Sequence, residues 1–161
     1  MDKILSKEPV KRVQDFIDNF DLKLKILVLN STARTAKAAA GSLNCEEGAI
    51  VKSLLFKVNN FFLICLISGD KRCSLKKLKG LLQEKDVSMA SANEVKKITG
   101  FSIGGVSPIA HLTKLDIFID ISLKKYNYIY AAAGHPSCVF KIQYNQLIKM
   151  REGLEKEITE W

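Results

Sequence analysis

The sequence predicts an α/β fold of the α+β kind: a single domain in which helices wrap a mixed, mainly antiparallel sheet. Two observations predict this class. Apolar segments of strand length recur along the chain, several joined by the short links that suit antiparallel neighbours. Segments with apolar residues at helical spacing lie before, between and after them. A chain of 161 residues can bury its own core, so we expect residues 1–161 to form one domain.

The N-terminal part of the chain predicts a helix, a strand and a second helix. Apolar residues at helical spacing indicate an amphipathic helix over residues 7–20, with Ser6 as its cap. Residues 24–29 have the length and branched side chains of a strand. The alanine-rich residues 35–43 predict a short helix, for which Ser31–Thr32 supplies possible caps.

A β-hairpin is the clearest pair of elements. The apolar segments 50–58 and 61–68 are separated only by Asn59 and Asn60, which tolerate the positive φ of a tight two-residue turn. The second segment is far shorter than the roughly 20 residues that span a bilayer, so it predicts a buried strand.

The remaining elements follow from the same patterns of apolar spacing and capping. They are a basic helix over residues 74–85, a helix over 92–100 capped by Ser91, strands over 115–121, 126–133 and 137–142, and a closing helix over 144–153.

Charge and cysteine content bound the classes of function. The formal net charge of +8 favours an anionic partner such as nucleic acid or a membrane surface. The first residues show no signal-peptide pattern, so we expect a cytoplasmic protein. Its four cysteines include no C-x-x-C pair and are expected to be free thiols.

A glycine-rich loop is the first candidate site. Gly104–Pro108 reads "GGVSP", and the adjacent glycines let another molecule approach the backbone, whose amides can cradle a carbonyl oxygen or an anion. A structural turn is the alternative, and the pattern is neither a dinucleotide-binding fingerprint nor a P-loop.

Lys52 is the second candidate, because it lies near the start of a strongly apolar strand. Its ammonium group must snorkel, pair or face a cleft. In a cleft it would bind phosphate or carboxylate, or stabilise negative charge that develops in a reaction.

The third candidate is the turn "AAAGHPSC", in which Gly134 precedes His135. The imidazole could donate a hydrogen bond or move protons near neutral pH, although a lone histidine is more often structural. His135 and Cys138 form an H-x-x-C pair without two further ligands, so no metal site is predicted. No thiol stands out as an activated nucleophile.

A basic segment follows the hairpin. It is either a solvated helix face or a surface that neutralises phosphates without reading bases. Its positive residues are Lys71, Arg72, Lys76, Lys77, Lys79 and Lys85, against the single acid Glu84.

Together these features resemble the YbaK family of aminoacyl-tRNA deacylases, whose fold is shared with the editing domain inserted in bacterial prolyl-tRNA synthetases. The resemblance runs from "TARTAKAAAGSL" to "QLIKM" and rests on "CEEGAIVKSLLF", "GGVSP", "DIFIDISL" and "AAAGH" in this order. It implies a mixed, mainly antiparallel sheet wrapped by helices.

The resemblance also implies an activity: trans-editing, the hydrolysis of the ester of mischarged tRNA. The implied substrate is a small amino acid, alanine or cysteine, on tRNA(Pro). Mischarged tRNA is the expected partner and prolyl-tRNA synthetase a candidate one, with no cofactor, metal, membrane or DNA involved.

Site residues are implied position by position. Lys52 matches the family's essential lysine, which helps to hold the terminal adenosine and the reacting ester. The implied substrate-binding residues are Gly104, Gly105, Val106, Ser107, Pro108, Gly134, His135 and Ser53. The residues expected to bind tRNA come from the basic segment after the hairpin and not from the resemblance: Lys71, Arg72, Lys76, Lys77 and Lys79.

This chemistry is physically reasonable, because an activated ester needs only a positioned water or substrate hydroxyl and stabilisation of the developing oxyanion. Backbone amides of residues 104–107 would orient the carbonyl, Lys52 would bind nearby oxygens, and His135 would contact the amino acid. Two alternatives stay open: a non-catalytic tRNA- or RNA-binding module of the same fold, and a small-molecule esterase or thiol-dependent hydrolase.

Overall fold

The strands of this protein form two sheets. The structure is a computed structural model that describes residues 3–21, 23–30, 35–151 and 154–160. One sheet has the strand order β4-β2-β3-β5-β8, and the other has the order β1-β7-β6. The β3–β5 and β5–β8 pairings are parallel, and the other four pairings of the described strands are antiparallel. The expected fold class, a mixed and mainly antiparallel β structure with helices around it, is confirmed.

The elements have the following bounds. The strands are β1 (Ile26–Val28), β2 (Val51–Val58), β3 (Phe61–Ser68), β4 (Val87–Met89), β5 (Asp116–Asp120), β6 (Ile129–Ala132), β7 (Cys138–Ile142) and β8 (Leu154–Lys156). The α-helices are α1 (Glu8–Phe20), α2 (Ala36–Leu43), α3 (Leu75–Leu82), α4 (Ala92–Thr99) and α5 (Tyr144–Arg151). Short 3-10 helices are η1 (Lys3–Ser6), η2 (Glu47–Ala49) and η3 (Ile121–Lys125).

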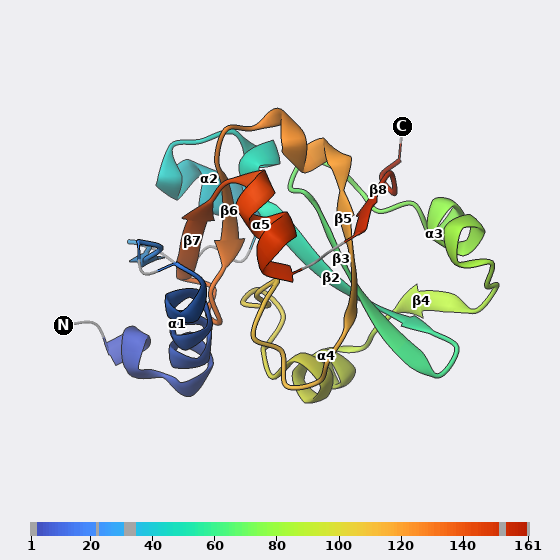
Figure 1. Cartoon of the computed structure of the whole chain (residues 1–161), viewed down its shortest axis with the longest axis horizontal. Coiled ribbons are helices and arrows are strands. Elements are labelled where there is room, and N and C mark those ends of the chain that lie inside the picture. The colour runs from blue at the N-terminus through green and yellow to red at the C-terminus, as the bar shows by residue number, and fades with distance from the viewer. Residues whose placement is uncertain (1–2, 22, 31–34, 152–153, 161) are drawn as a thin grey trace.

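Strand β2 lies between two apolar clusters, because successive side chains of a strand point to opposite faces. Val51 and Leu55 belong to the larger cluster, which also takes side chains from α1, α4 and α5. Phe56 and Val58 belong to the cluster that includes Leu78 of α3. Figure 1 shows α2 and the β6–β7 pair on one side of β2, and α3 and β4 toward the other end of the molecule.

Local signals placed several elements correctly. The hairpin forms as expected, with Val58 opposite Phe61 and Asn59 at a φ of 51° in the turn. Ser91 caps α4 in a full capping box with Glu94.

Other local predictions were wrong. Ser6 does not cap α1: it ends η1, and its hydroxyl donates to the carbonyl of Lys3 at 2.7 Å. The cap of α2 is Thr35, whose side chain accepts from the amide of Ala38, while Ser31 and Thr32 lie outside the described residues. Strand β6 is shorter than the expected 126–133, since η3 and bends occupy residues 121–128.

Candidate functional site

The first half of β2 borders a cavity, because none of the described strands pairs with it on the side away from β3. β4 pairs only with the residues from Phe56 to Val58, and beyond them the amide of Ala90 donates to the carbonyl of Leu55 at 3.0 Å. An isolated parallel bridge joins Ile50 to Tyr130 of β6. The space between holds a cavity of about 490 Å³, which is in the range of small-ligand sites.

The lining of this cavity is mostly apolar and comes from separate parts of the chain. α2, β2, β6 and the loop after α4 all contribute to it, and its small side chains include Ala36, Ala39 and Ala132. Met89 and Ile103 also line it, and both are more than half exposed, at 56% and 63%. The sequence pattern gave no signal for either as a cavity residue.

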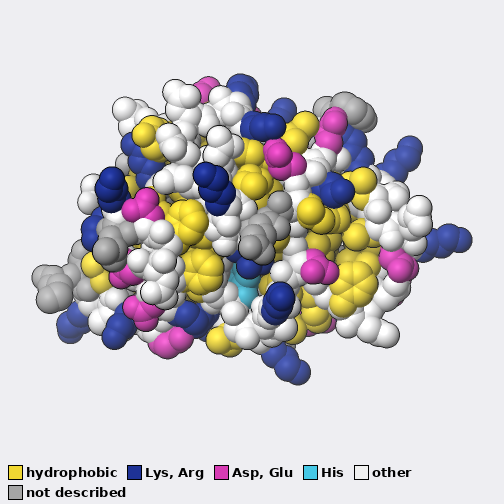
Figure 2. Space-filling model, viewed as in Figure 1, with side chains coloured by type: hydrophobic (Ala, Val, Ile, Leu, Met, Phe, Trp, Pro, Cys, Tyr) yellow, Lys and Arg dark blue, Asp and Glu magenta, His cyan; other side chains and the backbone are white. Residues whose placement is uncertain are grey.

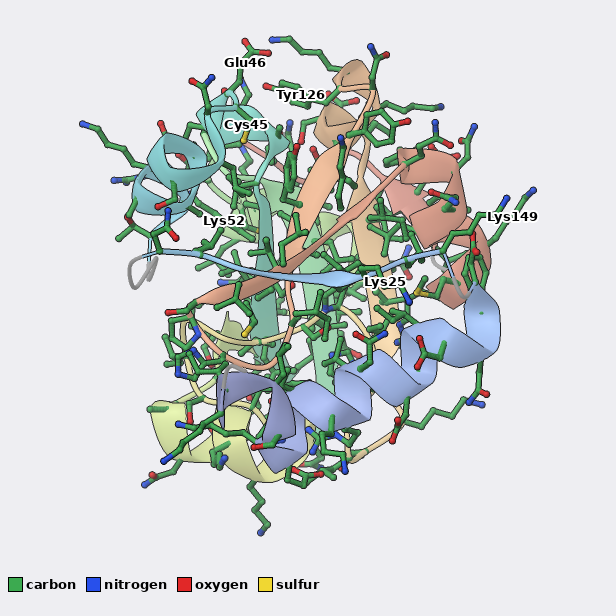
Figure 3. The ribbon with its side chains drawn as sticks, turned by 90° about the vertical axis from the view of Figure 1, so that its left-hand side faces the viewer. Lys25, Cys45, Glu46, Lys52, Tyr126 and Lys149 are labelled. Carbon is green, nitrogen blue, oxygen red and sulfur yellow. The ribbon has the colours of Figure 1, made fainter. Side chains whose placement is uncertain are left out.

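Lys52 lines the cavity and is anchored there. Its Nζ donates to the carbonyl of Lys71 at 2.8 Å, from the turn that follows β3. An ammonium group has three donors, so among the described residues this contact accounts for one and leaves two that can serve a ligand. Lys52 therefore donates a hydrogen bond to a backbone carbonyl and lines a cavity. Figure 3 shows its position relative to α2 and β1.

Ser53 lines the same cavity and carries a buried hydroxyl. Its Oγ is inaccessible to solvent and has no hydrogen-bond partner among the residues that the structure describes. Leaving a buried hydroxyl unpaired costs about 1–3 kcal/mol, so Ser53 is a candidate for ligand contact. The backbone amide and carbonyl groups of Leu55 point away from β3, toward Ala90. Those of Ser53 point to the same side, because residues two positions apart in a strand orient their backbone groups alike.

The glycine-rich loop and the Gly134–His135 turn lie against each other. The amide of Gly134 donates to the carbonyl of Gly105 at 3.1 Å. A Cβ at Gly105 would lie 2.9 Å from both the Cα and the amide nitrogen of His135, so only glycine permits this approach. Gly104, at a φ of 96°, and Val106 line the cavity.

Ser107 and Pro108 form the last part of the glycine-rich loop. Both are buried and do not line the cavity. The ring of His111 donates from Nε2 to the carbonyl of Ser107 at 2.7 Å, and the hydroxyl of Ser107 accepts from the amide of Ile109 at 3.4 Å. Their positions suit anchoring of the loop.

His135 is oriented by its own turn. The amide of Ser137 donates to Nδ1 at 3.0 Å, so the neutral ring carries its proton on Nε2. His135 itself does not line the cavity, whereas Pro136 and Cys138, which follow it, do.

A support beneath the loop was missed by the sequence analysis. The Arg12 guanidinium lies 4.5 Å from the centre of the Phe101 ring, and its Nε donates to the carbonyl of Ala110 at 2.7 Å. The Phe101 ring meets His111 edge to face, with centroids 6.1 Å apart. Arg12 and Ala110 are 98 positions apart, so no local pattern could link them.

Burial lowers the pKa of His111 to about 4, from an ordinary value of 6.5. The hydrogen bond to the Ser107 carbonyl acts in the opposite direction, and the positive charges of Arg151 and Arg12 add to the lowering. The ring is therefore neutral at pH 7 and serves as a fixed donor to the loop.

The basic residues after the hairpin divide into two groups. The carbonyl of Lys71 receives Lys52, whereas α3 lies far from α2 and the β6–β7 pair (Figure 1). The Nζ of Lys77 donates to the carbonyl of Thr159 at 2.7 Å and lies 3.9 Å from a carboxylate oxygen of Glu157. Lys71, Arg72, Lys76 and Lys79 are exposed.

Within the described residues, no group of three or more His, Cys, Asp or Glu side chains could hold a metal ion. The four cysteines, all of them described, form no disulfide. No described helix is long and apolar enough to cross a membrane.

Lys52, Ser53 and residues of the glycine-rich loop thus line one mostly apolar cavity, which is a candidate small-ligand site. The family model of the aminoacyl-tRNA editing domain matches residues 30–150, which is more than half of the chain. The chain belongs to this family.

Individual relatives agree with this assignment. The chain is 32% identical over 102 residues to the proline–tRNA ligase of Caldicellulosiruptor bescii, and 34% identical over 98 residues to that of Kosmotoga olearia. These matches cover 63% and 61% of this chain but only 18% and 17% of the ligases, so the chain spans less than a fifth of their length.

Solved structures are similar over nearly the whole chain. A crystal structure of a candidate trans-editing enzyme for prolyl tRNA synthetase superposes with a TM-score of 0.90 at 33% identity, covering 96% of this chain and 99% of that one. The crystal structure of the hypothetical protein APE2540 gives a TM-score of 0.86 at 27% identity, covering 92% and 99%.

Proposed function

We propose that this protein is a trans-editing aminoacyl-tRNA deacylase that hydrolyses the ester of a small amino acid, alanine or cysteine, wrongly attached to tRNA(Pro). The observation that carries the proposal is the convergence of Lys52, the unpaired Ser53 hydroxyl and Gly104 on one cavity. All 161 residues would form one editing domain, with mischarged tRNA as substrate and prolyl-tRNA synthetase as a candidate partner. Since tRNA is charged in the cytoplasm, the activity is placed there.

Each side chain has a role in this proposal. The remaining donors of the Lys52 ammonium bind oxygens of the terminal adenosine and stabilise negative charge as it develops on the ester. Ser53 donates to the ester or accepts from the amino group, which removes the cost of its buried, unpaired hydroxyl. The exposed apolar side chains of Met89 and Ile103 offer contact to the adenine ring at the cavity rim.

The reaction needs no protein nucleophile. Water attacks the aminoacyl carbonyl, the amides of the glycine-rich loop donate to the oxyanion, and the ribose 3′-oxygen leaves with a proton. The ribose 2′-hydroxyl, or the thiol of a cysteinyl substrate, lies close enough in the substrate itself to assist. His135 does not line the cavity itself, and the proposal assigns its ring to the amino-acid end from the turn beside the cavity.

Small side chains form part of the cavity wall, among them Ala36, Ala39 and Ala132, and the proposal assigns a small amino acid to that part of the cavity. One methylene changes binding by only about 1–3 kcal/mol, so the tRNA must supply part of the discrimination.

A deacylation panel tests the proposal. Purified protein is incubated with alanyl-, cysteinyl-, seryl- and prolyl-tRNA, each prepared on tRNA(Pro) and on a tRNA for another amino acid. We expect turnover of alanyl- or cysteinyl-tRNA(Pro) and none of prolyl-tRNA(Pro). Binding of tRNA without turnover of any member would instead support a non-catalytic RNA-binding module. Inactivation by thiol alkylation without a tRNA requirement would support a thiol-dependent hydrolase.

A further inference from the structure

A second, shallower hollow adjoins the cavity of Lys52. It has a volume of about 470 Å³, and Tyr130 lines both hollows. Its walls come from the residues between α2 and η2 and from the segment between η3 and β6. Figure 3 shows Cys45, Glu46 and Tyr126 gathered at one end of the molecule, on the far side of β1 from α1.

Aromatic rings and ammonium groups are paired on this surface, which we call the tyrosine hollow: Tyr126, Tyr128, Tyr130, Lys125 and Lys141. Lys141 of β7 lies directly opposite Tyr130 of β6 in the antiparallel register. Its Nζ lies 4.3 Å from the centre of the Tyr128 ring, and the Nζ of Lys125 lies 5.6 Å from that of Tyr126. The Tyr128 side chain is still 46% exposed.

The chemistry of the hollow suits a flat, anionic ligand. Lys141 lines the hollow together with Glu46, and the ammonium group of Lys125 lies beside the Tyr126 ring. Aromatic faces stack on unpaired bases without regard to base identity, and ammonium groups neutralise phosphates. The α3 surface is also basic but carries no aromatic side chain between residues 74 and 85.

We propose that the tyrosine hollow binds the unpaired nucleotides of the tRNA acceptor end next to the aminoacylated one, with a base stacked on Tyr128 and a phosphate beside Lys141. The inference rests on the proposed function, because it is the adjoining cavity that would receive the terminal adenosine. Tyr130, which lines both hollows, then lies between the reacting nucleotide and those that precede it.

Binding of a fluorescent single-stranded RNA that ends in C-C-A, measured by anisotropy, tests the hollow without any catalytic step. We expect Tyr128→Ala to weaken binding by about 5-fold or more and Tyr128→Phe to bind like the wild type, since phenylalanine keeps the stacking ring. Lys141→Ala should make binding less dependent on salt. The slope of log affinity against log salt concentration should fall in magnitude by about one, as expected for the loss of one phosphate contact. Lys11→Ala serves as the charge control, since Lys11 is an exposed residue of α1. Helix α1 lies across β1 from Cys45, Glu46 and Tyr126 (Figure 3).

Deacylation kinetics give a second readout. Tyr128→Ala should raise KM for the mischarged tRNA and leave kcat nearly unchanged, because the stacking contact is made equally before and during the reaction. Equal RNA affinity for wild type and Tyr128→Ala would overturn the inference, as would an equal loss in Tyr128→Phe. Loss of affinity for prolyl-tRNA synthetase alone in Tyr128→Ala would also overturn it, since the surface would then serve a protein.

The two proposals fail in different ways. If the wild type hydrolyses mischarged tRNA and Tyr128→Ala is indistinguishable from it, the inference fails and the proposed function stands. If Tyr128→Ala loses RNA affinity but the wild type hydrolyses no charged tRNA, the RNA surface stands and the proposed activity fails.

Discussion

The hydroxyl of Ser53 is one of two buried side-chain polar atoms that have no hydrogen-bond partner within the described residues, the other being Nε of Arg151. An unpaired buried hydroxyl lowers stability, and such a cost is expected to be offset by ligand binding. Substitution of Ser53 therefore breaks no side-chain hydrogen bond within the described residues, so a loss of activity would point to a role in function and not in folding.

Ser53→Ala should keep or slightly raise the midpoint of thermal unfolding, since it removes an unsatisfied group, and should lower kcat/KM for mischarged tRNA by about 10-fold. Ser53→Thr keeps the hydroxyl and is the matched control. A drop in the unfolding midpoint with unchanged kcat/KM would show that the hydroxyl stabilises the fold and does not contact substrate.

His111 predicts a pH dependence of stability. Its pKa of about 4 in the folded protein lies below its ordinary value of 6.5, so only the unfolded chain takes up the proton between these values. This contribution to the free energy of unfolding is complete above pH 6.5, falls as the pH drops, and levels off below pH 4. From the size of the shift its full extent is about 3 kcal/mol.

His111→Gln keeps an N–H donor for the Ser107 carbonyl but does not titrate. Urea unfolding at pH 7, 5.5 and 4.5 should therefore show a smaller loss of stability in this variant than in the wild type. Parallel curves for the two proteins would contradict the buried, neutral state of His111.

At the level of elements, the site depends on how the glycine-rich loop meets the Gly134–His135 turn. The contact is made by backbone, through the carbonyl of Gly105 and the amide of Gly134 at 3.1 Å. The Arg12, Phe101 and His111 side chains hold the loop from below. Displacement of the loop would move the amides assigned to the oxyanion.

Gly105→Ala should destabilise the protein by about 1–3 kcal/mol and lower kcat, because the added Cβ meets the backbone of His135 at 2.9 Å. Gly80→Ala is the matched control: its Cβ would meet nothing within 4 Å in α3, so we expect stabilisation of about 0.5–1 kcal/mol and unchanged kcat. Urea unfolding and deacylation rates of both variants check this. Equal behaviour of the two would contradict the close packing at Gly105.

Local sequence signals predict some elements and miss others for a physical reason. The hairpin and the Ser91 capping box are determined by neighbouring residues, and both form as expected. β4 and β8 were not predicted, because three residues are too few to show alternation. Their strand state comes from pairing with β2 and β5, which are distant in the sequence.

At the level of the whole molecule, the sequence named candidate residues but could not predict how they are arranged. Lys52, Ser53, Gly104 and Val106 do meet at one cavity, but Lys52 is anchored by a carbonyl that no pattern could identify. The net charge of +8 predicts an anionic partner but does not show which surface would bind it. In Figure 2 the Lys and Arg side chains are spread over the visible face and do not form one patch, so charge alone does not locate a binding surface.

The most direct test of the central claim is the rate at which Lys52→Ala deacylates alanyl- or cysteinyl-tRNA(Pro), whichever the wild type hydrolyses faster. We predict a loss of about 100-fold or more in kcat/KM, because the cation assigned to the developing charge is removed. The circular dichroism spectrum should stay unchanged, since Lys52 contributes one hydrogen bond to a turn carbonyl and little core packing. Wild-type turnover by a folded Lys52→Ala protein would contradict the account.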